Sequence, residues 1–207
     1  MKLYGFPPSP NTWKVRAVAN HLKLPLDFEL VDLTKPRPAS YLALNPTGRA
    51  PTLVDDDLKL WESTAIMQYL ASATKNALWP DDARRRADIM RWQSWGLAHL
   101  NAACAPLTFE RVVKKLTNQG PPDAAVVTKA LDGFHREVRV LDAHLAKQSY
   151  LVGEGLTLAD LSIAASLAYA PQAEMPLPQY KHAHAWFGRV TALPAWREAA
   201  PQMPAAA

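Results

Sequence analysis

Apolar and polar positions in the first part of the chain follow a strand pattern, then a helical one, then a strand pattern again. A short apolar run at residues 2–6 is stopped by two prolines, which cannot donate to a strand ladder. Apolar residues recur at helical spacing over residues 15–22, and residues 27–33 read as a second strand with Phe28 and Leu30 on one face. This order predicts a βαβ unit with two parallel strands.

The next segment predicts a hairpin followed by a helix. Residues 39–44 can form one or two helical turns before a turn that contains proline and glycine. Residues 49–54 and 58–61 are predicted strands joined by three aspartates, and so short a connection requires an antiparallel pair. A helical pattern then follows Ser63. The segment up to residue 75 therefore predicts a small mixed sheet with helices on its faces.

Strand patterns disappear beyond a proline-containing linker at residues 76–82. Pro106 should kink or end the first helix after the linker, and the Pro/Ala-rich tail after Trp196 should fray. The spacing of apolar residues predicts four helices in this half, at residues 83–103, 124–146, 158–169 and 180–192. We therefore expect two domains, a mixed α+β domain over residues 1–75 and an all-α domain over residues 83–200.

Residues 156–161 have the form of a helix start. Thr157 is expected at the N-cap and Asp160 at the third helical position, where its carboxylate can reach back, while Leu156 can pack onto Leu161. The helix that follows is apolar nearly all round, so it should be the buried centre of the helical domain. We interpret this motif as structural and assign it no catalytic role.

Composition and charge exclude several classes of function. The net charge of +4 is spread thinly, and the densest basic run, Arg84–Arg86, fits a solvated helix face better than a nucleic-acid site. No apolar run of about 18 residues predicts a membrane span, and the start of the chain lacks the order of a secretory signal, so we expect a cytoplasmic protein. The single cysteine, Cys104, excludes an internal disulfide and is expected to fill the core. The six histidines are scattered, and we expect no metal.

Ser9 and Asn11 are the first candidates for chemistry. Both lie in the turn between the first strand and the first helix, beside the free backbone N–H groups of a helix start. Such a turn stabilises an anion by donated hydrogen bonds and by the helix dipole. The alternative is that both side chains simply cap the helix, which is their everyday use.

Four short motifs together resemble the cytosolic glutathione transferase family, and the resemblance covers nearly the whole chain. In chain order they are FPPSPNTWKVR at residues 6–16, LNPTGRAP at 44–51, LWESTAI at 60–66 and LTLADLSIA at 156–164. The chain looks like a bacterial member that is either serine-type, similar to the phi and theta classes, or nu-like. The resemblance implies a thioredoxin-like βαβ-ββα domain that binds glutathione, followed by an all-helical domain that contributes a hydrophobic substrate pocket.

The resemblance also implies residues that bind glutathione. In the family, the proline that matches Pro51 is cis, and the residue that matches Ala50 pairs its backbone with the cysteinyl part of the tripeptide. Glu62 and Ser63 can be argued from chemistry, because the γ-glutamyl end carries both a carboxylate and an ammonium group. Ser63 at a helix start offers a hydroxyl and N–H groups to the carboxylate, and Glu62 can accept the ammonium. Taken alone, the pair is equally compatible with plain capping.

The glycyl carboxylate of glutathione needs a cation. Lys35, Arg37 and Arg49 are the candidates, and the first two lie in an irregular loop. The sequence leaves the choice between them open.

The residue that activates the thiol is Ser9 or Asn11. Ser9 stands where serine-type members keep their serine, whereas the run Ser9-Pro10-Asn11-x-x-Lys14 also resembles nu-like members, which use a threonine and the asparagine on the sulfur. Tyr4 and Thr12 are the next candidates. A charge-assisted hydrogen bond contributes roughly 1.5–3 kcal/mol, which would lower the thiol pKa by about one to two units. Glutathione is the co-substrate, and no metal or organic cofactor is required.

The pocket for the second substrate is expected between the two domains. The predicted lining residues are Phe6, Pro8, Ala103, Pro106 and Phe109. Aromatic residues at helical spacing are more often core than pocket, and the sequence does not identify the substrate.

Three functions are compatible with these residues. The first is conjugation of glutathione thiolate to a small hydrophobic electrophile, a detoxification reaction. The second is glutathione-dependent reduction of disulfides or peroxides, as in nu-like members, and the third is a non-catalytic binding module. The family resemblance and the tryptophan-rich helix after Ala83 also predict a homodimer. We expect no nucleic-acid partner and no membrane association.

Overall fold

The computed structural model describes residues 1–201, so most of the tail that was expected to fray, from residue 202, lies outside the described residues. Contacts divide the chain into two compact units. The first contains Met1–Trp79 together with the segment from Ala192 onward, and the second contains Pro80–Thr191. Each unit is described separately below.

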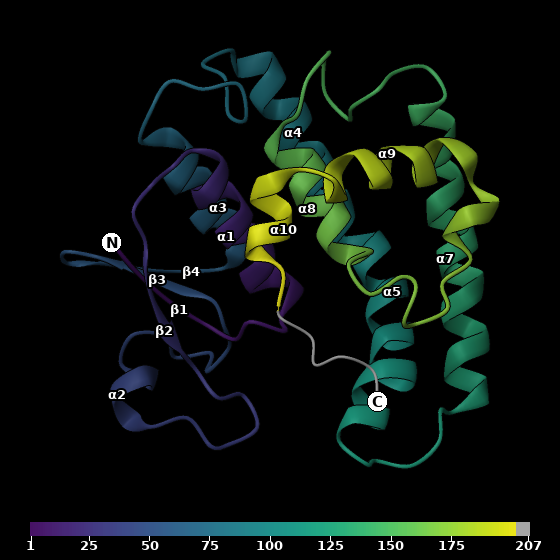
Figure 1. Ribbon diagram of the computed structural model, residues 1–207, viewed down its shortest axis with the longest axis horizontal. Coiled ribbons are helices and arrows are strands. Elements are labelled where there is room, and N and C mark those ends of the chain that lie inside the picture. The colour runs from purple at the N-terminus through teal and green to yellow at the C-terminus, as the bar shows by residue number, and fades with distance from the viewer. Residues whose placement is uncertain (202–207) are drawn as a thin grey trace. The chain divides into compact units, whose positions relative to one another are not determined.

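The first unit is built on a four-stranded mixed sheet (Figure 1). Its strands are β1 (Lys2–Gly5), β2 (Asp27–Leu30), β3 (Thr52–Asp55) and β4 (Leu58–Trp61), in the spatial order β2-β1-β3-β4. β1 and β2 are parallel, whereas β1–β3 and β3–β4 are antiparallel. The predicted βαβ unit and the predicted hairpin are both confirmed.

β2 is shorter and more exposed than predicted. It ends at Leu30, not at residue 33, and all four of its residues are exposed. Phe28 is 40% and Leu30 62% accessible, because β2 is an edge strand with a partner on one side only. The guanidinium of Arg16 covers the Phe28 ring at 5.2 Å.

Helices cover both faces of the sheet (Figure 1). Helices α1 (Pro10–His21) and α3 (Ser63–Ser72) lie together on one face, where Leu3 and Leu53 are fully buried. The short helix α2 (Ala39–Leu42) lies on the other face, where Tyr4 and Tyr41 pack with ring centroids 6.1 Å apart. The two faces of β1 therefore have separate cores.

Helix α10 (Pro194–Ala199) also belongs to the first unit, which corrects the prediction that residues 83–200 form one domain. Trp13 Nε1 donates to the carbonyl of Trp196 at 2.9 Å, and the two indole rings stack at 5.0 Å. The side chains of Arg16 and Asn20 donate to carbonyls of the same segment. Hydrophobic periodicity assigns a helix to a face but does not identify its partner, and this explains the error.

In the second unit, one helical run continues from Ala83 to Leu116 although Pro106 lies inside it. The run consists of α4 (Ala83–Trp95), the π-helical η1 (Gly96–Leu100), α5 (Asn101–Thr108), the π-helical η2 (Phe109–Val113) and α6 (Lys114–Leu116). Proline removes one backbone donor from a helix, and wider π turns lie on both sides of Pro106. The prediction of a helix limited to residues 83–103 was wrong.

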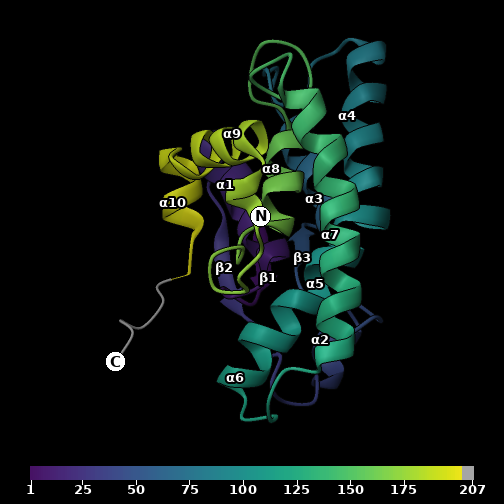
Figure 2. The ribbon, with the colours of Figure 1, turned by 90° about the vertical axis from the view of Figure 1, so that its right-hand side faces the viewer.

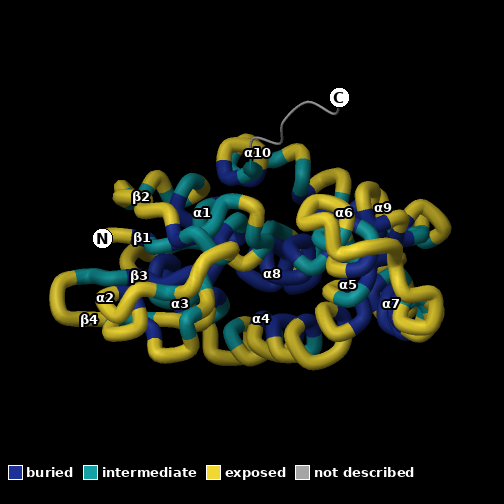
Figure 3. Tube along the Cα trace, turned by 90° about the horizontal axis from the view of Figure 1, so that it is seen from below, coloured by how far each residue is buried: buried dark blue, intermediate teal, exposed yellow. Residues whose placement is uncertain are grey.

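The remaining helices confirm the predicted order. They are α7 (Ala124–Leu145), α8 (Leu158–Ser166) and α9 (Lys181–Thr191), with a 3₁₀ turn, η3 (Leu177–Gln179), before α9. α7 runs beside α5 (Figure 2), and α8 lies at the buried centre of the unit (Figure 3). Among the described residues, no helix is both long and apolar enough to span a bilayer.

Asp160 anchors the start of α8 through hydrogen bonds that its carboxylate accepts. One oxygen accepts from the backbone N–H of Leu151 and from Trp186 Nε1, each at 2.9 Å. The other accepts from the backbone N–H of Thr157 at 2.9 Å and from its hydroxyl at 3.0 Å. Burial raises the pKa of Asp160 although these hydrogen bonds oppose the shift. The predicted capping arrangement is confirmed.

Candidate functional site

The turn between β1 and α1 presents Ser9 without using its hydroxyl as a cap. Ser9 occupies the N-cap position, with Pro10 next, but the N-cap side chain makes no capping hydrogen bond. The turn is held instead by the backbone N–H of Ser9, which donates to the carbonyl of Phe6 at 2.9 Å, and by the backbone N–H of Phe6, which donates to the Thr12 hydroxyl at 3.2 Å. The hydroxyl of Thr12 is therefore committed to the turn, whereas that of Ser9 is not.

Gly5 allows this turn to approach α1 closely. A Cβ at residue 5 would lie 2.6 Å from the Thr12 methyl carbon and 2.9 Å from the Phe28 ring. Side chains do not tolerate such distances, so glycine is required where β1 leads into the turn. The position of Ser9 thus follows from the packing just before it.

Asn11 connects the first turn of α1 to the first residue of α3. Ser63 Oγ donates to Asn11 Oδ1 at 3.2 Å. Ser63 is 6% accessible, whereas Asn11 is exposed. Because this contact uses the amide oxygen, the amide NH₂ group of Asn11 remains a donor directed elsewhere. Two predicted site residues that are 52 positions apart in the sequence are in direct contact.

Glu62 is the N-cap residue of α3, and its backbone has a conformation that residues other than glycine seldom adopt. Its φ is 70°, and its carbonyl accepts the hydrogen bond from Ile66 N–H at 3.0 Å that begins the helix. Non-glycine residues at positive φ are uncommon and cluster at functional sites. The Thr64 hydroxyl, one position into the helix after Ser63, is buried without a hydrogen-bond partner among the described residues. This helix start therefore has unsatisfied polar groups beside an acid.

Lys14 belongs to the same cluster, and the sequence analysis gave it no role in the site. Its side chain is 3% accessible, and burial lowers its pKa to about 8, while the charge of Glu62 opposes the shift. The signal in the sequence was its spacing, since Lys14 precedes Val18 by four positions on the buried stripe of α1.

The peptide bond between Ala50 and Pro51 is cis, as the resemblance implies. The carbonyl just before Ala50 is held by two side chains, since Tyr41 Oη donates to the Arg49 carbonyl at 2.6 Å and Asn45 Nδ2 donates at 2.8 Å. Asn45 and Tyr41 also meet the buried hydroxyl of Thr52. The backbone at Ala50 is thereby fixed on both sides.

The three candidate cations differ in how far they are already engaged. Lys35 pairs with Asp32 at 3.4 Å. The guanidinium of Arg37 donates to the backbone carbonyls of Asp32 and Leu33. Arg49 is exposed and forms no ion pair with any residue that the structure describes. Arg49 is thus the most available of the three for an external carboxylate.

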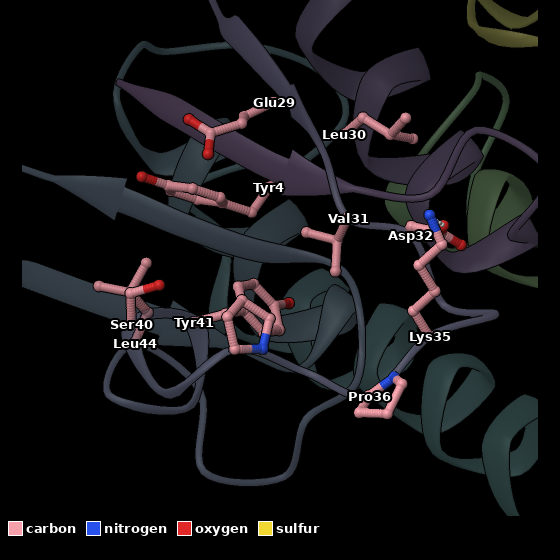
Figure 4. Close-up of a pocket in the computed structure, with 11 residues that line it drawn as sticks. Tyr4, Glu29, Leu30, Val31, Asp32, Lys35, Pro36, Ser40, Tyr41 and Leu44 are labelled. Carbon is pink, nitrogen blue, oxygen red and sulfur yellow. Dashed lines mark ion pairs between the residues drawn. The ribbon is translucent and has the colours of Figure 1, made fainter.

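Tyr4 lies apart from this cluster. Its ring lines a cavity of about 380 Å³ on the α2 face of the sheet, together with Glu29, Val31 and Tyr41 (Figure 4). Side chains alternate across a strand, and Leu3 points into the core under α1 and α3. Tyr4 therefore faces away from that core, which weakens it as an alternative to Ser9.

In the second unit, a cavity of about 930 Å³ is lined by η1 and α5 on one side and by α7 on the other. Ala103 and Pro106, two of the predicted pocket residues, both line it, whereas Phe109 is 43% accessible and is not part of its wall. Phe6 and Pro8 belong to the first unit. The shared pocket between domains stays a prediction.

Cys104 is buried and its pKa is raised by burial, as expected for a core residue.

Comparison with known families gives matches in both halves of the chain. The model of the glutathione S-transferase N-terminal domain matches residues 3–77, and that of the C-terminal domain matches residues 100–194. Glutathione S-transferase 3 of Zea mays is 37% identical over 213 residues, covering 99% of this chain and 95% of the relative. A glutathione S-transferase of Hyoscyamus muticus is 33% identical, with coverage of 96% and 97%.

Solved structures give the same result. Glutathione S-transferase III in its apo form superposes with a TM-score of 0.85 at 36% identity, covering 98% of this chain and 99% of the other. A theta-class glutathione S-transferase from the citrus canker pathogen Xanthomonas axonopodis pv. citri, with glutathione bound, superposes with a TM-score of 0.86 at 30% identity, covering 98% and 97%.

Proposed function

Because the chain belongs to the glutathione S-transferase family, we propose that Ser9, Asn11, Ala50, Glu62 and Ser63 together hold glutathione on its first unit. The bound thiol ionises and attacks a small hydrophobic electrophile. The hydrogen bond from Ser63 to Asn11 supports this site most directly. It joins the turn proposed to hold the sulfur to the helix start proposed to hold the γ-glutamyl group.

The γ-glutamyl end of glutathione is a zwitterion, and the start of α3 complements both of its charges. The carboxylate accepts hydrogen bonds from the Ser63 hydroxyl and from free N–H groups of the first turn of α3. The ammonium group pairs with the carboxylate of Glu62. The backbone of Ala50, beside the cis bond to Pro51, pairs with the cysteinyl residue. Arg49, with Arg37 as the alternative, neutralises the glycyl carboxylate.

The thiol is activated at the turn before α1. A free thiol has a pKa of about 8.5, and only its thiolate is a good nucleophile. The Ser9 hydroxyl, which does not cap the helix, donates to the sulfur and stabilises the thiolate. This assignment makes the protein a serine-type member of the family.

Reduction of disulfides or peroxides is the second candidate function. It is favoured by Asn11, whose amide oxygen is occupied by Ser63 and whose NH₂ group is therefore presented as a donor. In this alternative Asn11 holds the sulfur, as in nu-like members. In this reaction glutathione thiols are oxidised while the disulfide or peroxide substrate is reduced, and no conjugate forms.

Apolar residues predicted for the electrophile pocket occur in each unit. Phe6 and Pro8 come from the turn that carries Ser9, and Ala103, Pro106 and Phe109 come from the helical unit. The cavity that contains Ala103 and Pro106 has a volume in the range typical of sites for small molecules. Alanines, Pro106 and Val126 form the apolar part of its wall, and His99, Lys129, Asp132 and Arg136 also line it.

A panel of substrates tests this function. We expect glutathione-dependent turnover of an aryl halide, and weaker or no activity with an organic hydroperoxide and a mixed disulfide. Calorimetry should show that the Glu62→Ala, Ser63→Ala double variant binds glutathione at least about tenfold more weakly, or about 1.4 kcal/mol. Unchanged affinity in a folded double variant would remove the assignment of the site. Activity with the disulfide alone would favour the reductase.

We also propose a homodimer. Trp92, one of the tryptophans of α4, is buried within its own unit. The exposed apolar side chains of the helical unit include Met90 and Leu97, which are each 48% accessible, and Val126 and Val140 on α7. A second copy would cover them. Light scattering at micromolar concentration should give twice the chain mass, and a monomer would contradict this proposal.

We also propose a cytoplasmic location and a role in detoxification. Both agree with a transferase that acts on small hydrophobic electrophiles.

A further inference from the structure

Lys14 is a buried cation that the proposed function has not used. Its side chain is 3% accessible, yet neither a hydrogen bond nor an ion pair joins its ammonium group to the residues that the structure describes. Lysine is almost never buried without a partner, because removing its charge from water is costly. A buried cation of this kind is suited to receive an anion.

The fold directs the Lys14 side chain toward the start of α3. Lys14 follows Asn11 by one helical turn, so both residues lie on the same face of α1. Long side chains in a helix lean toward its N-terminus, which here is the end where Asn11 meets Ser63. Glu62, beside Ser63, is close enough for its charge to act on Lys14, although no ion pair forms between them.

We propose that Lys14 is the cation that neutralises the γ-glutamyl carboxylate of glutathione. Ser63 and the N–H groups of α3 supply neutral donors to this carboxylate, and Lys14 supplies the positive charge. Each charge of the γ-glutamyl group then faces a side chain of opposite charge. Its ammonium faces Glu62, and its carboxylate faces Lys14. Lys14 is thus a binding residue that rests on the proposed glutathione site and extends it.

The elements around Lys14 carry few other charged groups that could pair with its ammonium. On α1 itself the other charged or titratable residues are Arg16 and His21, and Arg16 is directed to the carbonyl of Ala199. β1 contributes Lys2, which pairs with Glu29, and α10 contributes Arg197 and Glu198. Among the described residues, Glu62 is the one whose charge acts on Lys14.

A comparison of three ligands tests the proposal. The probes are S-methylglutathione, whose sulfur cannot titrate, its analogue with a 4-aminobutyryl group, which lacks the carboxylate, and its glutaryl analogue, which lacks the ammonium. In the wild-type protein, loss of the carboxylate should weaken binding at least about tenfold. In Lys14→Met, S-methylglutathione should bind about tenfold more weakly, and removal of the carboxylate should then cost about threefold or less. Lys115→Met, which changes an exposed lysine of α6, should leave every ratio unchanged.

The wild-type protein provides a second readout that needs no variant. The pKa of Lys14 without ligand is about 8, and a bound carboxylate raises it because a nearby negative charge favours the ammonium form. Affinity for S-methylglutathione should therefore be highest below about pH 8 and fall as the pH rises above it. The glutaryl analogue keeps the carboxylate but has no ammonium group of its own to titrate, so it should show the same fall, and a flat pH profile for this analogue would overturn the proposal.

The outcomes separate this proposal from the proposed function. If Lys14→Met weakens all three ligands equally, or couples to the ammonium rather than to the carboxylate, Lys14 acts on the fold or through Glu62 and the proposal is wrong. If the Glu62→Ala, Ser63→Ala variant loses affinity while Lys14→Met does not, the glutathione site stands without Lys14. If neither variant loses affinity, the site itself is wrong. Lys14→Gln replaces Lys14→Met should the latter fail to fold.

Discussion

Replacing Ser9 by alanine is expected to raise the pKa of protein-bound glutathione thiol by about one to two units, the size of one charge-assisted hydrogen bond. The thiolate fraction near neutral pH, and with it the rate of conjugation, should fall roughly 8- to 25-fold. Affinity for glutathione should change little, because Ala50, Glu62 and Ser63 hold the tripeptide. Ultraviolet titration of the thiolate in the binary complex measures the shift directly.

Asn11→Ala is the matched variant in the same turn. Capping is the alternative use of this side chain that the sequence allows, but Asn11 does not cap α1 and instead accepts the hydrogen bond from Ser63. It should therefore cost about 0.5–1.5 kcal/mol of stability through this bond and leave the thiol pKa unchanged. The opposite ranking, with Asn11→Ala abolishing the thiolate and Ser9→Ala doing little, would establish the nu-like alternative. If neither variant moves the titration, the sulfur is activated by another group.

The second large effect concerns the fold. Asp160→Ala should lower the free energy of unfolding by about 3–5 kcal/mol, because the change leaves the buried donors of Leu151, Thr157 and Trp186 without their acceptor. Asp160→Asn should recover little of this loss, because its NH₂ group would face N–H donors in place of one carboxylate oxygen. Urea unfolding at one fixed protein concentration measures both variants.

Asp123→Ala provides the matched control for this experiment. Asp123 also caps a helix, accepting from the N–H groups of Ala125 and Val126, but it does so at an exposed position at the start of α7. Its loss should cost about 1 kcal/mol. A loss for Asp160→Ala no larger than that for Asp123→Ala would show that burial adds nothing to the cap.

The order and type of most elements could be predicted because they depend on local signals. Period-2 and helical spacing, two prolines after β1 and three aspartates between β3 and β4 are all readable within a few residues of the element they define. The capping arrangement at Thr157 and Asp160 is equally local. What could not be predicted depends on packing between distant segments. Leu30 is apolar yet exposed, because nothing pairs with the outer side of β2.

For the candidate site as well, the individual residues could be predicted from local motifs, but their contacts could not. Ser63 and Asn11 were each selected from their own motif, but their contact is a property of how α1 packs on α3. The free hydroxyl of Ser9 could not be distinguished from a cap, since both place serine before a helix. Lys14 was named only as part of a motif, because its burial is a property of the folded unit.

The docking of α10 onto α1 has a consequence for how the protein is made. The segment that completes the first unit is separated from it by the whole of Pro80–Thr191, so the ribosome releases Met1–Trp79 long before the residues that cover Trp13 exist. Until translation is nearly finished, the helix that follows Ser9 carries an indole with no partner. A nascent chain that stops before Pro194 therefore lacks the packing of Trp196 on Trp13 in the unit proposed to bind glutathione.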